Sequence, residues 1–441
     1  MRLRYIRAFA LLFFLVNPFF YINADSPEGV ASLLDKELKA DLGHGSWLRF
    51  SFVSQFWARY TELNEGTVTQ AGDPIGSDID FAMRRTRFTV QASFQDRVIL
   101  YTQLGFNNMS SSSPKPEIYL HDVWTMFRII PDSWYVGFGL HGWAGLSRLS
   151  NVSSQRPLTL DNPGFNYPAI NRTDIDNRQT GMFMKGTAGR VSYRVAINKP
   201  FVYDGRPDGV PDTDVAYEYP SKELSYKGYF ALHLWDKEYF NTSYLGMTTL
   251  GEKKLFNIGA GFDYFPESMA WYDDAGNINR ENQLHFAADL FMELPMAGRQ
   301  SLSLYSVLYK YDFGKNYLRT SGTVNVWNKS NNPSEIAPEG FGNGEFRVGT
   351  GTVWYNEAGY LFPENFLNVP GRIQLFYAAS DKNFEALNTS MWKHDMGGHY
   401  YAAGQKLKFT VQYSLRPMLN NALSEVKTHK SSVILQVQAA L

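Results

Sequence analysis

Polar and apolar positions alternate with a period of two from Trp47 to the end of the chain. The segment 406–415 reads KLKFTVQYSL, and residues 432–441 repeat the same alternation. A period of two is typical of β-strands that have one apolar and one polar face. Ten residues are about the length with which a tilted strand crosses a bilayer. The pattern therefore indicates strands with one face against lipid.

About sixteen such segments follow one another, within the usual accuracy of boundaries taken from one sequence. Tight turns alternate with long polar connections at 62–78, 142–177, 199–223, 312–344 and 417–431, as in bacterial outer-membrane barrels. Because every backbone N–H and C=O needs a partner in hydrocarbon, strands cross a membrane only as a closed sheet. We predict an all-β fold, a transmembrane antiparallel β-barrel of about 16 strands over residues 47–441. The strands are expected to begin near Trp47, Ile79, Arg97, Glu117, Ser133, Arg178, Arg190, Leu224, Lys254, Asn282, Gln300, Glu345, Gly371, Asp395, Gln405 and Ser432.

The first 46 residues have a different pattern. Three arginines precede an apolar run in residues 8–16, which predicts a secretory signal peptide over residues 1–24. A permanent membrane anchor is the alternative, but Asn17 and Pro18 interrupt the apolar run. In residues 25–46, apolar residues recur at helical spacing and predict a short periplasmic helix. That helix either contacts a neighbouring subunit or packs on the end of the barrel.

Composition narrows the class of protein. Aromatic residues make up 16% of the chain and charged residues 19%, and the mean hydropathy of -0.31 excludes a bundle of membrane helices. The formal net charge of -1 argues against a nucleic-acid partner. The absence of cysteine excludes disulfides and thiolate chemistry, and it suits export through an oxidising periplasm. These features favour a location in the bacterial outer membrane.

If the apolar residues face lipid, the alternate residues face the lumen of the barrel. More of these are basic than acidic, and such a lumen concentrates anions and depletes cations. The alternative is that the cations are paired with lumen acids and only brace the wall. The predicted pore-lining cations are Arg49, Arg59, Arg85, Arg87, Arg194, Lys227, Arg372, Lys406 and Lys408. The predicted inward acids are Asp263, Asp289 and Glu293, together with Asp122, whose face the alternation leaves open.

The loop from Gly142 to Asp176 is long enough to fold back into the lumen and narrow it. It offers cations beside carboxylates, which would orient small charged solutes without holding them tightly. The predicted constriction consists of Arg148, Arg156 and Arg172 beside Asp161, Asp174 and Asp176.

Signals for catalysis are poor. The sequence has no nucleophile-elbow, zinc-protease or phosphate-loop motif. His394 and His399 have no common metal-ligand spacing, so a place in a loop or at a rim is the better interpretation. We therefore expect no enzymatic activity, no metal and no cofactor.

Several segments, taken in order, resemble the phosphate-selective porin O/P family, in particular its relatives in Bacteroidetes. The segments are FAMRRTRF at 81–88, LHDVW at 120–124, NRQTG at 177–181, LGEKKLFNIGAGFDYF at 250–265 and GGHYY at 397–401. The resemblance implies a sixteen-stranded, commonly trimeric outer-membrane porin that prefers anions. The stretch before the long loop, GFGLHGW at 137–143, lacks the lysine of that family, so no phosphate site is carried over.

The sequence therefore leaves three functions to compare. The first is a porin that lets small hydrophilic solutes, preferably anions, diffuse passively. The second is a structural or assembly-associated barrel whose lumen is plugged by loop 142–177 or the N-terminal helix. The third, weakest hypothesis is a barrel enzyme acting on lipids or surface glycans. The expected partners are outer-membrane lipid, small anions, the outer-membrane insertion machinery and two further copies in a homotrimer.

Overall fold

The computed structural model describes residues 38–69, 71–113, 117–143, 145–201, 215–217, 222–238, 244–325 and 336–441. The predicted signal peptide at 1–24 lies outside the described residues, as do residues 25–37 of the predicted helix. Among the residues described, no helix is long and apolar enough to cross a membrane.

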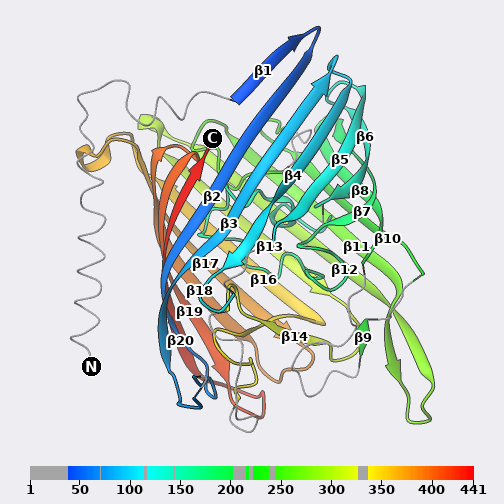
Figure 1. The fold of residues 1–441 in the computed structure, drawn as a ribbon, viewed down its shortest axis with the longest axis vertical. Helices are drawn as coiled ribbons and strands as arrows, with labels where there is room; N and C mark the ends of the chain where they lie inside the picture. Colours follow the sequence, from blue (N-terminus) through cyan, green and yellow to red (C-terminus); the bar gives the residue numbers. More distant parts are fainter. Residues whose placement is uncertain are drawn as a thin grey trace.

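Sixteen antiparallel strands form one closed barrel (Figure 1). The sheet closes where β20 returns beside β2, with partners from Val53 and Ala440 to Thr61 and Ser432. The barrel strands are β2 (Ser46–Glu62), β3 (Ser77–Phe94), β4 (Val98–Met109), β5 (Tyr119–Ile130), β6 (Trp134–His141), β7 (Gln179–Ala188), β8 (Val191–Lys199), β10 (Ser225–His233), β11 (Leu255–Tyr272), β12 (Ile278–Pro295), β13 (Ser301–Tyr311), β16 (Gly351–Leu361), β17 (Arg372–Phe384), β18 (Met391–Ala403), β19 (Leu407–Leu419) and β20 (Val426–Ala440). The predicted barrel and its strand number are confirmed.

The remaining elements are short. Strand β9 (Ala216–Tyr217) pairs with β11, while β14 (Leu318–Ser321) and β15 (Glu345–Gly349) form a separate two-stranded sheet. The strand expected from Glu345 is therefore β15, and the barrel strand begins only at Gly351. Single-turn 3₁₀ helices lie at η2 (Leu149–Asn151), η3 (Ala297–Arg299) and η5 (Phe366–Asn368).

Residues 38–43 correct one expectation. They form strand β1 (Leu38–Gly43), which continues β2 outward as a hairpin. The turn Gly43–His44–Gly45 has positive φ at all three positions, which glycine adopts without strain. The predicted helix at 25–46 therefore does not reach this far, because the turn pairs the chain with β2 from Ser46 onward.

The alternation along each strand separates lipid-facing from inward side chains. On β19, Val411 and Tyr413 are 42% and 37% exposed, whereas Thr410 and Gln412 between them are 3% and 8% exposed. Apolar side chains on the outside of a barrel match hydrocarbon, and polar ones inside match water or protein. The end of the barrel that carries the short turns is called the short-turn rim below. The opposite end, which carries the long connections, is called the long-loop rim.

Candidate pore lumen

The connection between β6 and β7, residues 142–178, folds into the barrel and crosses the lumen. Its backbone contacts the opposite wall: the N–H of Leu160 donates to Gln412 over 2.9 Å, and Lys408 donates to the carbonyl of Gln155 over 3.0 Å. This segment is called the crossing loop below. It stands where a constriction loop was predicted.

A β-bulge on β3 supplies one attachment of the crossing loop. The register against β2 shifts between Gln55 and Phe56, so that Arg84 and Arg85 both point inward. Arg85 donates to one oxygen of Asp161 over 2.7 Å, and Arg84 donates to the other over 2.8 Å. Burial would raise the pKa of Asp161, but the two guanidiniums outweigh burial and hold that pKa below its usual value.

A second bulge, on β5, builds the next attachment. There the register against β4 shifts so that His121 and Asp122 are both fully buried on the inside. Arg178 donates to Asp122 over 3.2 Å, and Asp176 accepts from Arg178 and lies 3.6 Å from Arg87. Burial would raise the pKa of Asp176, but His121, Arg178 and Arg87 together hold it far below its usual value.

The connection from β10 to β11, residues 234–254, also enters the lumen, from the short-turn rim. Arg148 of the crossing loop donates to both oxygens of Glu238, over 2.6 and 2.8 Å, and Val152 forms a parallel bridge with Leu245. Glu293 on β12 accepts from the hydroxyl of Thr248 over 2.9 Å. The described parts of this connection, at 234–238 and 244–254, thus contact the crossing loop and the inner wall.

Apolar packing fills the part of the lumen next to β11, β12, β13, β16 and β17. The ring of Phe165, from the crossing loop, lies 5.9 Å from that of Tyr309 and 5.5 Å from that of Tyr355. Leu146 and Met247 are completely buried in the same cluster. Packed apolar side chains exclude water, so this side of the lumen is closed to hydrated solutes.

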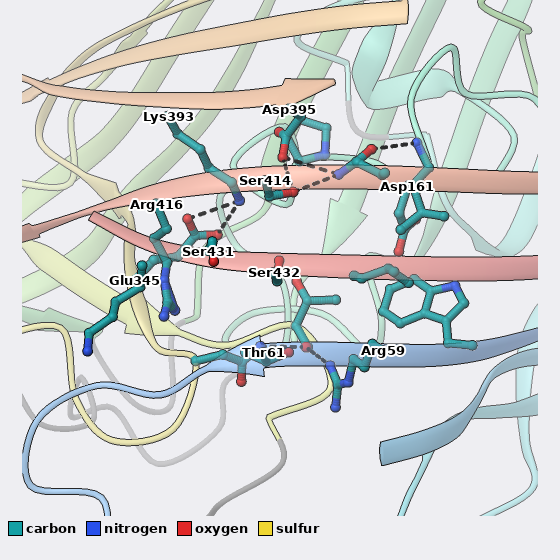
Figure 2. Close-up of a pocket in the computed structure, with 18 of the residues that line it drawn as sticks. Arg59, Thr61, Asp161, Glu345, Lys393, Asp395, Ser414, Arg416, Ser431 and Ser432 are labelled. Atoms are coloured by element: carbon teal, nitrogen blue, oxygen red, sulfur yellow. Dashed lines mark hydrogen bonds and ion pairs between the residues drawn. The ribbon is translucent and has the colours of Figure 1, made fainter. Parts of the chain in front are cut away.

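A polar cavity of about 100 Å³ lies on the opposite side, between the crossing loop, the 312–350 connection and strands β2, β18, β19 and β20. Figure 2 shows Arg59, Lys393 and Arg416 among its walls, together with Asp161 and Glu345. Apart from Trp57 and a few aliphatic side chains, its walls carry charged, hydroxyl or amide groups. Such a lining suits a hydrated, polar solute.

Most of the predicted lumen cations are buried on the inside, and many of them have fixed partners. Arg59 binds Asp80 through two hydrogen bonds, Lys227 donates to Asp263 over 2.8 Å, and Arg87 donates to backbone carbonyls. Arg194 and Lys408 are 2% and 0% exposed, whereas Arg49, Arg372 and Lys406 are half-buried near the short-turn rim. Arg59, Arg85 and Lys227 are thus each paired with a carboxylate inside the barrel.

The three predicted constriction cations lie in different environments in the structure. Arg148 is buried against Glu238, and its guanidinium lies 3.7 Å from the ring centroid of Phe291. Arg156 is exposed and Arg172 is half-buried. Only Asp161, of the predicted constriction residues, lines the polar cavity. Arg148 therefore anchors the crossing loop and does not face a solute.

Of the cations that line the cavity, sequence reasoning named Arg59 and missed the other three. Lys393 and Lys430 precede the strands predicted from Asp395 and Ser432, because β18 and β20 begin earlier than expected, and Arg416 follows directly on the alternating segment 406–415. The alternation of polar and apolar residues continues to Arg416, but residues 427–432 are all polar and give no such signal for Lys430. Arg84 gave no such signal, because strict alternation assigns it to the outer face.

Comparison with known proteins shows the fold. No family model matches the chain, and no curated protein sequence matches it either. Among solved structures, the outer-membrane channel DcaP of Acinetobacter baumannii is similar, with 11% identity, a TM-score of 0.50, and 90% of this chain and 98% of that chain covered. OprB of Pseudomonas putida is similar with 10% identity, a TM-score of 0.50, and 90% and 94% covered. The chain thus has the barrel fold of these two outer-membrane proteins.

Proposed function

We propose that this chain is an outer-membrane porin through which small hydrophilic solutes diffuse passively. The observation that carries the proposal is the polar cavity beside the crossing loop, which lies opposite the apolar cluster around Phe165. A passage lined by fixed charges and hydroxyls lets a solute exchange its water for protein groups without tight binding. No cofactor and no turnover are part of this function.

A preference for anions is the finer part of the proposal. At the long-loop end of the cavity, Glu345 is contacted by Lys393 at 3.2 Å, by Arg347 at 3.1 Å and by Lys382 at 3.7 Å. Burial would raise the pKa of Glu345, but the surrounding cations hold it well below its usual value. Three cations around one carboxylate leave a positive surplus, which attracts anions. Arg59 and Arg85, being paired, contribute less to it.

We also propose how the chain is exported, inserted and assembled. The chain would be exported by the signal peptide at 1–24, inserted by the outer-membrane machinery and assembled as a homotrimer. Membership of the phosphate-selective porin O/P family is proposed from the short motifs alone. Phosphate specificity is not part of the proposal, because the lysine before the crossing loop is missing.

A second candidate is a structural barrel without conductance. The apolar cluster that joins Phe165, Met247 and the aromatic wall favours it, because this cluster closes much of the lumen. The two candidates differ in whether ions pass.

Single-channel recording in a salt gradient separates them. Purified protein should insert into planar bilayers, conduct, and give a reversal potential displaced toward that of the anion. Lys430→Met, in the cavity wall, should move the reversal potential toward zero, whereas Lys427→Met should leave it unchanged. Lys427 is the matched control, because it lies on the same strand but is exposed and paired with Glu65. Inserted protein that never conducts would establish the structural barrel instead.

A further inference from the structure

The polar cavity carries two adjacent bands of side chains with different chemistry. Ser414 on β19 pairs in register with Asp395 on β18 and with Ser432 on β20, which pairs in turn with Thr61 on β2. These four residues, one carboxylate and three hydroxyls across four strands, are called the hydroxyl band. Figure 2 shows them one below another down the middle of the view, from Asp395 at the top to Thr61.

The second band lies two residues further along each strand, toward the long-loop rim. Arg416 pairs with Lys430, and continuing the β18–β19 register by one residue from His394 and Leu415 brings Lys393 beside Arg416. Lys393, Arg416 and Lys430 are called the cation band. Two residues of a strand span about 7 Å, so the two bands are separated by the length of a small organic molecule.

The cation band is suited to a carboxylate. Among the described residues, Arg416 donates only to neutral oxygens: the carbonyls of Gly344 and Glu62, each at 3.1 Å, and the side chain of Asn64 at 2.9 Å. Lys393 shares the single carboxylate of Glu345 with other cations. An incoming anion would therefore meet positive charge that the protein's own carboxylates do not cancel.

The hydroxyl band is suited to hydroxyl groups. Gln412 and Ser414 both donate to Oδ1 of Asp395, which leaves Oδ2 to accept from a ligand. Serine and threonine hydroxyls both donate and accept, so they match alcohols better than an ammonium group, which only donates. The ring of Trp57, which also lines the cavity, adds an apolar wall for the carbon face of such a ligand.

We infer that this cavity is a binding site for a small polyhydroxylated carboxylate, a compound of the sugar-acid class. Its carboxylate would lie against the cation band and its hydroxyls against the hydroxyl band. A neutral sugar would leave the cation band unmatched, and a simple fatty carboxylate would leave Oδ2 of Asp395 unmatched. The inference rests on the proposed diffusion function and names its solute.

The test compares three probes on the full chain: sodium glucuronate, sodium propionate and glucose. Titration calorimetry in detergent measures binding, and block of the single-channel current measures occupancy during conduction. Glucuronate should bind at least about tenfold more tightly than propionate or glucose, since each lacks one set of hydrogen bonds. Equal affinities for glucuronate and propionate would overturn the assignment.

Substitutions in each band test which group of the ligand that band binds. Asp395→Asn keeps the acceptor at Oδ1 and should reduce glucuronate affinity to that of propionate, without changing propionate binding. Lys393→Met should weaken both carboxylates and leave glucose unchanged. Lys427→Met, outside the cavity, is the control and should change nothing. Unaltered glucuronate binding in Asp395→Asn and Lys393→Met would also overturn the assignment.

Measuring binding and conduction together tests the binding site and the diffusion function separately. Glucuronate binding that the variants abolish, in a protein that never conducts, would disprove diffusion and support the site. Conduction with no preference among the three probes would support diffusion and disprove the site.

Discussion

The guanidinium of Arg85 lies 2.7 Å from the carboxylate of Asp161, and this contact fastens the crossing loop to the barrel wall. Asp161 also borders the polar cavity. The same carboxylate therefore both holds the loop and forms part of the cavity wall.

Asp161→Asn should detach the crossing loop from β3. Removing one partner of a buried ion pair costs about 3–5 kcal/mol, and here two arginines lose their counter-charge. We expect a lower thermal midpoint in detergent and a larger, noisier single-channel conductance. Asp273→Asn, in the exposed β11–β12 turn, should leave conductance unchanged. Unchanged conductance in Asp161→Asn would show that the loop is held by its other contacts.

Arg148→Met should loosen the junction between the crossing loop and residues 234–254. The variant keeps apolar contact with Phe291 but leaves Glu238, otherwise paired at 2.6 Å, without its cation. We expect a marked fall in the thermal midpoint. The control is Arg299→Met, whose pair with Glu364 is largely exposed and contributes little. Equal midpoints for the two variants would contradict the anchoring role of Arg148.

Gly261→Ala should push the crossing loop away from β11. A Cβ at this position would lie 2.3 Å from the carbonyl oxygen of Gly145 and 2.4 Å from that of Leu146, both backbone atoms that cannot rotate away. We expect reduced protease resistance within the loop and a lower thermal midpoint. Gly76→Ala is the matched control, since nothing lies within 4 Å of its Cβ. A tolerated Gly261→Ala would mean that the loop approaches β11 less closely.

Asp174→Asn should make the protein more stable above neutral pH. Burial raises the pKa of Asp174 to about 7, while in the unfolded chain it is about 4. Between these values the unfolded chain releases a proton that the folded chain keeps, so ionisation progressively costs stability as pH rises and the cost is complete above pH 7. Asparagine can still accept the two backbone N–H groups of Asn171 and Asn177 at Oδ1. Thermal midpoints should therefore be similar near pH 4 and higher for the variant at pH 8; a constant difference across this range would refute the assignment.

The barrel could be predicted because its cause is local. The period of two in a segment such as 406–415 results from one face meeting hydrocarbon, and this requirement is the same along the whole strand. The alternation of short and long connections then orders the strands without further information. Strand ends were harder to place, as Arg416 and Lys430 show, because strands continue past the lipid boundary where polar residues occupy both faces.

The lumen could not be predicted in the same way. Whether Arg59 or Lys227 is free or paired depends on Asp80 and Asp263, which other strands bring opposite them. A bulge turns Arg84 inward against the alternation. The sequence by itself determined a closed barrel with polar residues inside, because each strand meets lipid alone. Only the tertiary structure decided which charges meet across the lumen, because those contacts join residues far apart in the chain and their energies depend on burial and distance.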